Sequence, residues 1–370
     1  MSTPTYRVAL LSNAMHQDMY ARAFSQHPRL EIAVVAEEPD QEAVIDARGR
    51  RLARDLNVSH TTDVNATLAR PDIDVVSVCA EIERRGRLAE MVAKSGKHLW
   101  MDKPLAPTLE ECDAIVAAAG RTGMRSLVYS HLGAGYVQIA HKSIDDGVIG
   151  DLVALHIDFH FAKGDPDREA GAGPVELSSL DRWTYRSDDL WSDPSDSGHN
   201  VTVKRELFEL GIYPVGIVRQ LAGRDIRRVQ ASAGNYFFRA HAERGAEDFA
   251  TLSLTMDDCV ATISVGRIGR HSHPQTGSQT IHAVGTAGTL VVDSSRQAMT
   301  VCSSEGGSPC TQSVAMHDVS GGDAIVDHFV RVLDGEEEPW IDVAEGRKQV
   351  EVLLAGYRSI STGQPVDLPV

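Results

Sequence analysis

Short apolar runs alternate with segments of helical periodicity over the first 130 residues. The apolar runs lie at 7–11, 30–36, 74–79, 98–101 and 126–129, and apolar residues recur every three or four positions in the segments between them. Strands that are apolar throughout and separated by helices are typical of a parallel sheet that is covered on both faces. Residues 1–130 are therefore predicted to form a doubly wound α/β domain, the Rossmann architecture.

The pattern changes after about residue 150, where strand-like segments follow one another directly. They are predicted at 153–161, 229–238, 249–256, 260–268, 278–284 and 290–292, and turn residues such as 256–259 and 285–288 separate several of them. Such a series suits an antiparallel sheet. Helices are predicted over 203–221, 324–333 and 343–360. Residues 131–370 are therefore predicted to be a second, α+β domain with an open, mainly antiparallel sheet.

Composition narrows the possible partners. The net charge of −16 disfavours non-specific binding to nucleic acid or anionic membranes. No segment approaches the ~20 apolar residues that span a bilayer, and the first residues show no export pattern, so we expect a cytoplasmic protein. The five cysteines are scattered without a CxxC pair, which argues against disulfides and a thiolate zinc site. A small-molecule partner and no metal are expected.

The most informative stretch is Met101–Leu105, with the sequence MDKPL. Lys103 would lie at the end of a buried strand, beside a proline that turns the chain, with its ammonium at the carboxyl edge of the sheet. A solvated surface lysine is the alternative, but the apolar residues before and after this position disfavour it. Lys103 is thus a candidate for proton chemistry.

Four motifs resemble the Gfo/Idh/MocA family of dinucleotide-dependent oxidoreductases. They are GKHLWMDKP at 96–104, DGVIGD at 146–151, ELGIY at 209–213 and GTAGTL at 285–290, in the order and spacing of that family. The resemblance covers nearly the whole chain. It implies an NAD-dependent oxidoreductase acting on a hydroxyl or carbonyl of a sugar, sugar acid or cyclitol. It also implies that residues 131–370 serve substrate binding and oligomerisation, with a homo-oligomer, dimer or tetramer, formed through the open sheet.

The expected cofactor loop departs from the family pattern. The family has GxGxxG after the first strand, whereas this chain has Ser12–Gln17, SNAMHQ, without a glycine. Ser12 and Ala14 are small enough to permit close approach of a pyrophosphate, and Gln17 departs most. A loop that has decayed into a packing turn is the alternative. Arg85 stands where many members of the family have a histidine near the nicotinamide.

Glu37 at the end of the second strand favours retained cofactor binding. A carboxylate at this distance from the loop accepts hydrogen bonds from the ribose hydroxyls and repels a 2′-phosphate, and no arginine follows it immediately, so NAD is predicted in preference to NADP. A solvated acidic turn is the alternative reading of Glu37. The predicted cofactor-binding residues are Ser12, Asn13, Ala14, Met15, Glu37, Ala80, Arg85, Asp102 and Lys103.

The resemblance assigns proton transfer to Lys103 and Tyr213. Glu209 precedes Tyr213 by four residues and Arg205 lies one turn earlier, so all three are expected on one helical face. A nearby cation lowers the pKa of a phenol, which makes a lysine and a tyrosine a chemically sensible pair. An interfacial aromatic residue is an equally good interpretation of Tyr213. The predicted catalytic residues are Lys103, Tyr213 and Glu209.

Further candidates concern the substrate. Trp183, on a long polar segment at 164–200, offers a face on which a sugar ring can stack, although a loop packed on its own aromatic residues is equally compatible. The predicted substrate-binding residues are His131, Trp183, Arg205, His271 and His273. His156, Asp158 and His160 alternate along one strand, where a polar sheet face is a more ordinary interpretation than a metal site.

Two other functions remain open from the sequence. An enzyme of the same family that oxidises its substrate transiently and then eliminates a glycosidic substituent would use the same cofactor without net redox change. A non-catalytic ligand sensor would explain the missing glycines, but it would not explain Lys103 and Tyr213.

Overall fold

The computed structural model describes residues 5–39, 41, 43–162, 205–269, 277–303, 310–313 and 322–370. The chain divides into two compact units. The first comprises Met1–Ser130 with Gly321–Val350, and the second comprises His131–Ser320 with Glu351–Val370. Among the described residues, no helix is both long enough and apolar enough to cross a membrane.

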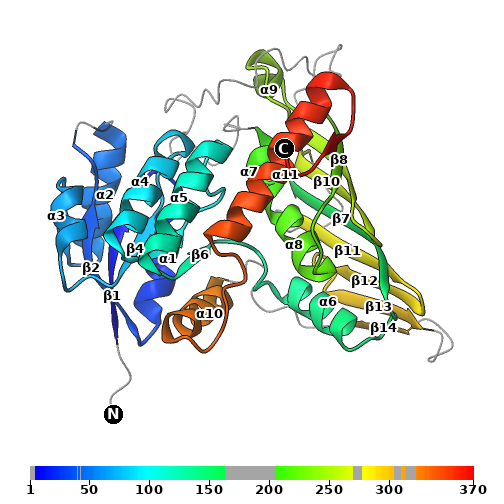
Figure 1. Ribbon diagram of the computed structural model, residues 1–370, viewed down its shortest axis with the longest axis horizontal. Helices are drawn as coiled ribbons and strands as arrows, with labels where there is room; N and C mark the ends of the chain where they lie inside the picture. The colour runs from blue at the N-terminus through cyan, green and yellow to red at the C-terminus, as the bar shows by residue number, and fades with distance from the viewer. Residues whose placement is uncertain are drawn as a thin grey trace. The chain divides into compact units, whose positions relative to one another are not determined.

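The first unit contains a six-stranded sheet in the order β3-β2-β1-β4-β5-β6, and all neighbouring strands are parallel (Figure 1). This confirms the predicted doubly wound domain. The order reverses between β1 and β4, which is where open α/β sheets bind ligands at the carboxyl ends of their strands. The strands are β1 (Tyr6–Leu11), β2 (Leu30–Ala36), β3 (Ser59–Thr61), β4 (Val75–Val78), β5 (His98–Met101) and β6 (Ser126–Val128).

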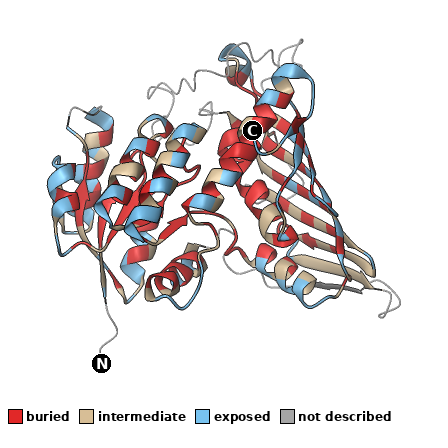
Figure 2. Cartoon of the chain, in the orientation of Figure 1, coloured by how far each residue is buried: buried red, intermediate tan, exposed pale blue. Residues whose placement is uncertain are grey.

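Helices lie on the sheet of the first unit, whose central strands are almost entirely buried (Figure 2). Thr108 begins α5 by accepting a hydrogen bond from the Glu111 backbone N–H, and Gly123 ends it in the left-handed conformation. These are favoured helix boundaries. The helices are α1 (Gln17–Gln26), α2 (Ala43–Asp55), α3 (Val64–Ala69), α4 (Ile82–Ser95), α5 (Leu109–Thr122) and α10 (Gly322–Asp334).

The segment containing α10 belongs to the first unit, although the sequence pattern assigned it by continuity to residues 131–370. Phe329 packs its ring against Trp100 with 5.3 Å between ring centroids. Asp334 accepts a hydrogen bond from the Tyr6 hydroxyl at 2.8 Å and pairs with Arg29. The apolar face of α10 is therefore part of the core beside β5, which sequence continuity does not reveal.

The second unit contains a nine-stranded sheet in the order β14-β13-β12-β11-β7-β10-β9-β8-β15. Only β7 and β10 pair in parallel; the other neighbours are antiparallel, as predicted. The strands are β7 (Leu152–Ala162), β8 (Arg228–Gly234), β9 (Phe249–Thr255), β10 (Val260–Ile268), β11 (Gly277–Gly285), β12 (Gly288–Asp293), β13 (Ala298–Ser303), β14 (Cys310–Ser313) and β15 (Val366–Asp367). The helices are α6 (Gly135–Asp145), α7 (Glu206–Glu209), α8 (Ile212–Ala222), α9 (Arg239–Glu243) and α11 (Val343–Thr362), of which α11 contributes to both units.

The two faces of this sheet differ. Helices α6 and α8 pack on one face, and β7 alternates between buried residues on that side and exposed residues on the other. On the exposed side, the imidazoles of His156 and His160 contact the hydroxyls of Thr262 and Ser264 at 2.7 and 2.8 Å. The alternating histidines thus belong to a polar sheet face.

The helix predicted over 203–221 is interrupted. Helix α7 ends at Glu209, and α8 begins at Ile212. A side chain at Gly211 would place its Cβ 2.1 Å from the carbonyl oxygen of Leu207, so the chain can turn here only because this residue is glycine. Glu209 and Tyr213 therefore lie on two successive helices, and the prediction that they share one helical face with Arg205 is wrong.

Candidate active site

The candidate active site of the first unit lies where β1, β2, β4 and β5 end. Lys103 follows β5, as predicted, and is only 3% exposed. Its backbone N–H donates to Asp102 Oδ1 at 2.9 Å, and the peptide bond between Lys103 and Pro104 is cis. The motif thus places a lysine at the carboxyl edge of the sheet rather than on a solvated surface.

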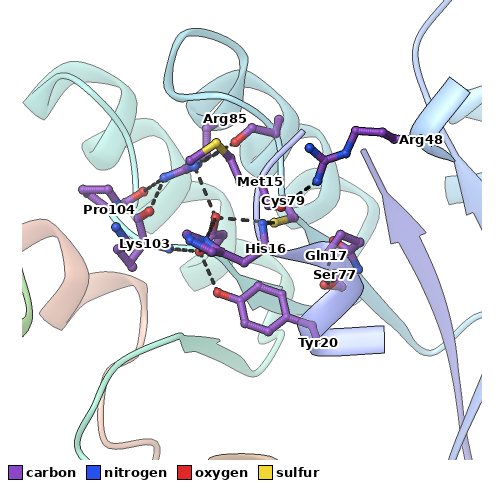
Figure 3. Close-up of polar contacts among 12 residues, drawn as sticks. Met15, His16, Gln17, Tyr20, Arg48, Ser77, Cys79, Arg85, Lys103 and Pro104 are labelled. Carbon is purple, nitrogen blue, oxygen red and sulfur yellow. Dashed lines mark hydrogen bonds and ion pairs between the residues drawn. The ribbon is translucent and has the colours of Figure 1, made fainter. Parts of the chain in front are cut away.

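Asp102 is fully buried and is the centre of a polar network, whose partners His16, Tyr20 and Arg85 are labelled in Figure 3. Its carboxylate accepts a hydrogen bond from the Tyr20 hydroxyl at 2.6 Å, lies 3.1 Å from His16 Nδ1, and accepts from Arg85 at 3.3 Å. Burial by itself raises the pKa of this carboxyl, but the nearby His16 and Arg85 outweigh burial and hold the pKa well below its usual range. Asp102 is therefore ionised at neutral pH.

Arg85 is held inside this network. Its guanidinium is fully buried and donates to the carbonyl oxygens of Ala80 at 2.8 Å, Pro104 at 3.1 Å and Lys103. These bonds tie the end of β4 to the turn that carries Lys103. Arg85 and Ala80, predicted to contact the cofactor, therefore position Lys103 in this structure.

The loop that replaces the family's glycine motif keeps one feature of it. Ser12 has φ of 64°, the left-handed conformation that glycine adopts at low cost. Ala14 is buried, and Asn13 donates from its amide to the carbonyl of Arg48 at 3.3 Å. The tight turn after β1 is thus preserved without a glycine.

The end of the loop is built differently. Gln17 is fully buried at the start of α1, and its amide exchanges hydrogen bonds with the Ser77 hydroxyl on β4 at 3.0 and 3.3 Å. The backbone N–H groups of Met15 and His16 donate to the carbonyl and the sulfur of Cys79, at 3.2 and 2.9 Å. Polar contacts therefore join α1 to β4 where the family's third glycine allows direct packing. Two backbone N–H groups just before α1 are already occupied by hydrogen bonds to Cys79.

Glu37 lies at the end of β2, as predicted, and is only 1% exposed. Its Oε1 pairs with Arg84 at 2.9 Å, and Arg84 also contacts Glu38 at 3.1 Å, Glu81, and the Ser12 hydroxyl at 3.2 Å. Arg84 thus links the ends of β1, β2 and β4. It was not identified as a site residue from the sequence. Its position in the first turn of the helix after β4 was the available signal.

These residues fit a dinucleotide at its ribose end. Glu37 Oε2 is buried and has no hydrogen-bond partner among the described residues, and a ribose hydroxyl is a donor that would satisfy it. The conformation of Ser12 and the small side chain of Ala14 suit the approach of a phosphate group. The backbone N–H groups of Met15 and His16 already donate to Cys79. Fewer hydrogen-bond donors therefore remain in this loop for a pyrophosphate.

In the second unit, Tyr213 lies in the first turn of α8 within an aromatic cluster. Its ring stacks on Phe159 of β7 with 5.4 Å between centroids, and the His131 ring lies 4.2 Å from it. Tyr213 is 8% exposed and Glu209 is 2% exposed. The structure thus brings together His131 and Tyr213, two residues that were predicted for substrate binding and catalysis.

Arg205 contacts internal groups of the same unit. Its guanidinium lies 3.5 Å from the carboxylate of the buried Glu247 and 5.9 Å from the centre of the Tyr357 ring. Burial raises the pKa of Glu247, and Arg205 opposes that shift. Trp183, His271 and His273 lie outside the described residues.

Comparisons with known proteins agree with this fold and these motifs. The model of the oxidoreductase family with an NAD-binding Rossmann fold matches residues 8–130, and the Gfo/Idh/MocA C-terminal domain model matches residues 137–291. The chain belongs to the Gfo/Idh/MocA family of oxidoreductases. Its dinucleotide-binding fold and its mainly antiparallel second sheet are those of the family.

Characterised relatives are distant. The scyllo-inositol 2-dehydrogenase (NAD+) of Bacillus subtilis is 24% identical over 88% of this chain and 87% of its own length. The D-apiose dehydrogenase of Paraburkholderia graminis is 24% identical over 83% of this chain and 76% of its own length. Other matches are shorter, such as one that covers 42% of an uncharacterized oxidoreductase of Escherichia coli. The crystal structure of an oxidoreductase from Agrobacterium radiobacter in complex with NAD+, L-tartaric acid and magnesium superposes with a TM-score of 0.76 at 17% identity, covering 98% of both chains.

Proposed function

We propose that this protein is an NAD-dependent dehydrogenase that interconverts a hydroxyl and a carbonyl group on a sugar, sugar acid or cyclitol. The observation that carries the proposal is the placement of Ser12, Glu37 and Lys103 at the carboxyl ends of β1, β2 and β5 of one parallel sheet. The reversal of strand order beside β1 is where such sheets bind nucleotides. The relatives that act on apiose and scyllo-inositol support the substrate class.

The residues of the first unit have separable roles in this proposal. Glu37 would bind the ribose hydroxyls, and Ser12 and Ala14 would let the backbone approach the phosphates. The nicotinamide, when bound, supplies the hydride acceptor. Lys103 would move the proton of the substrate hydroxyl, and the buried network of Asp102 and Arg85 would fix the backbone on which Lys103 is mounted. Tyr213 is proposed as a second proton-transfer residue.

A Lys103→Met substitution tests the chemistry. Methionine keeps much of the length and removes the ammonium, so turnover should fall on the order of 10²–10⁴-fold, the usual contribution of positioned proton transfer. The matched control is Lys94→Met, because Lys94 lies on the exposed side of α4 and pairs only with Glu90 among the contacts described. NADH formation would be followed on a panel of aldoses, sugar acids and inositols. Wild-type turnover in Lys103→Met, with nucleotide still bound, would remove Lys103 from the mechanism.

The preference between NAD and NADP depends on Glu37 and Arg84 together. Arg84 neutralises part of the negative charge of Glu37, and if it turned outward it could meet a 2′-phosphate. We propose that NAD is preferred, because Glu38 and Glu81 also hold Arg84. Calorimetric titration should then show tighter NAD binding, a wider preference in Arg84→Met and a narrower one in Glu37→Gln. Equal changes for both nucleotides would contradict this assignment.

Transient oxidation followed by elimination is the second outcome of the same assay. An enzyme of that kind would retain a bound dinucleotide and consume a glycoside without accumulating NADH. A denatured-protein extract that contains no nucleotide, together with no binding of NAD or NADP at millimolar concentration, would overturn both catalytic proposals and favour a ligand sensor.

We also propose that a homo-oligomer forms through the polar face of the nine-stranded sheet, the face on which β7 places its exposed side chains. The exposed side chains of Val153 and Val260, 42% and 47% accessible, lie on its strands β7 and β10. Light scattering coupled to gel filtration should report a dimer or tetramer. A monomer at micromolar concentration would contradict this proposal.

A further inference from the structure

Three potential metal ligands of different chemical types converge at the edge of the first sheet. His16 comes from the loop after β1, Cys79 follows β4 and Asp102 follows β5. The imidazole Nδ1, the thiol sulfur and a carboxylate oxygen of these residues all lie within 4.8 Å of one another. Figure 3 shows His16 and Cys79 beside one another in this network. The cysteines' scattered positions in the sequence gave no sign of this cluster.

The spacing of these atoms suits a tetrahedral ion. Typical zinc distances to sulfur, nitrogen and oxygen imply about 3.3–3.7 Å between neighbouring ligand atoms. His16 Nδ1 lies 3.1 Å from the carboxylate of Asp102, and the Cys79 sulfur lies 3.4 Å from Asp102 Oδ2. These two distances differ from the ideal spacing by a few tenths of an ångström, and the third pair, His16 Nδ1 and the Cys79 sulfur, lies within 4.8 Å.

The surroundings resemble an outer coordination shell. The Tyr20 hydroxyl and the Lys103 backbone N–H both bond to Asp102 Oδ1, which orients the carboxylate. The His16 backbone N–H donates to the Cys79 sulfur at 2.9 Å and orients it, while burial and the neighbouring Asp102 raise the pKa of the metal-free thiol, so the bound ion has to displace its proton. Such supporting bonds orient ligands and raise metal affinity. The His16 side chain is 36% exposed, which gives an ion access from solvent and leaves room for water as the fourth ligand.

The charge and the chemical type of the three ligands favour a particular metal ion. A doubly charged cation with one thiolate, one carboxylate and a neutral imidazole forms a site of zero net charge, which is compatible with the buried Arg85 beside Asp102. Sulfur and nitrogen ligands favour zinc over magnesium or calcium. Binding breaks the S–H bond of Cys79, forms a sulfur–metal bond and releases one proton to solvent; no electrons are transferred.

We propose that His16, Cys79 and Asp102 form a three-ligand site for Zn²⁺ with an open fourth position. The ion would fasten the glycine-free loop to the ends of β4 and β5. The proposal does not depend on the dehydrogenase activity, since its test needs neither nucleotide nor substrate.

The test uses the full-length, reduced protein after removal of metals with a chelator. Titration with Co²⁺ should show one equivalent bound, with visible d–d bands of tetrahedral intensity and a near-ultraviolet charge-transfer band from the thiolate. Binding of either ion to the metal-free protein should release one proton per ion in a weakly buffered solution containing a pH indicator, and Zn²⁺ should then displace Co²⁺ without further proton release. Absence of stoichiometric binding to the wild-type protein would overturn the proposal.

Variants locate the site. Cys79→Ser should abolish the charge-transfer band, and His16→Ala should weaken affinity by at least about 100-fold, more than the 10–100-fold typical of an outer-shell change. His16 is partly exposed, so its variant keeps the proposal testable if Cys79→Ser does not fold. The matched control is Cys112→Ser, since Cys112 is also buried in the first unit, on α5. A band that survives in His16→Ala at full affinity, or is lost in Cys112→Ser, would contradict the assignment.

Discussion

Replacing Asp102 by asparagine tests whether the buried network depends on charge. Asparagine has the shape of aspartate but only one acceptor oxygen. Asp102 Oδ1 accepts from the Lys103 backbone N–H at 2.9 Å, and Oδ2 accepts from Arg85 at 3.3 Å. Whichever way the amide is turned, its NH₂ group faces one of these two donors. The variant therefore loses the ion pair and gains a donor–donor contact.

The expected destabilisation follows from the burial of both partners. Removing one member of a buried ion pair costs about 3–5 kcal/mol, because the remaining charge is left without compensation. Arg85 keeps three carbonyl acceptors, from Ala80, Lys103 and Pro104, so the lower end of that range applies. We expect Asp102→Asn to reduce the free energy of unfolding of the first unit by about 3 kcal/mol.

Urea unfolding followed by tryptophan fluorescence measures this change, because Trp100 is fully buried in the first unit. A chelator in the buffer removes any contribution from bound metal, and the two units require analysis for separate transitions. The control is Asp113→Asn, whose exposed pair with Arg347 should be worth less than about 1 kcal/mol. A loss below about 1 kcal/mol in Asp102→Asn would show that the carbonyls alone satisfy Arg85 and would refute the reasoning.

Two further changes have defined outcomes. Ser12→Gly removes the cost of a left-handed backbone at a residue with a side chain, about 1 kcal/mol, and also removes a hydrogen bond from Arg84 that is worth a similar amount. Scanning calorimetry should therefore find unchanged or higher thermal stability, and titration calorimetry should find that NAD binds no more weakly. His328 accepts the Trp340 backbone N–H at Nε2, which requires the neutral ring, and burial lowers its pKa. Because the unfolded state then binds more protons, the free energy of unfolding should fall as pH drops below about 6.5, and His328→Gln should show less of this fall. A large loss of NAD affinity in the first variant, or an identical pH profile in the second, would contradict these accounts.

The fold could be predicted because its signals are local. Apolar runs of four to seven residues mark β1, β2, β4 and β5, and the helices between them follow from periodicity. Strand β3, of only three residues with the sequence SHT, carries no such signal and was missed. The packing of α10 in the first unit was missed for another reason: its amphipathic face shows that it is buried but not which core receives it.

The site shows the same division between local and tertiary information. Lys103 could be placed because a buried strand and a proline fix its position along the chain. Its neighbours could not, since His16, Cys79 and Asp102 are separated by more than 20 residues from one another and meet only through the parallel pairing of β1, β4 and β5. Where the family has glycines, this chain has larger residues, and polar side chains at the carboxyl ends of β1, β4 and β5 form hydrogen bonds with one another. The function of the loop therefore depends on the residues that replace the glycines as well as on the retained lysine motif. Experiments on His16 of the loop, and on Cys79 that bonds to it, test that function as directly as experiments on Lys103.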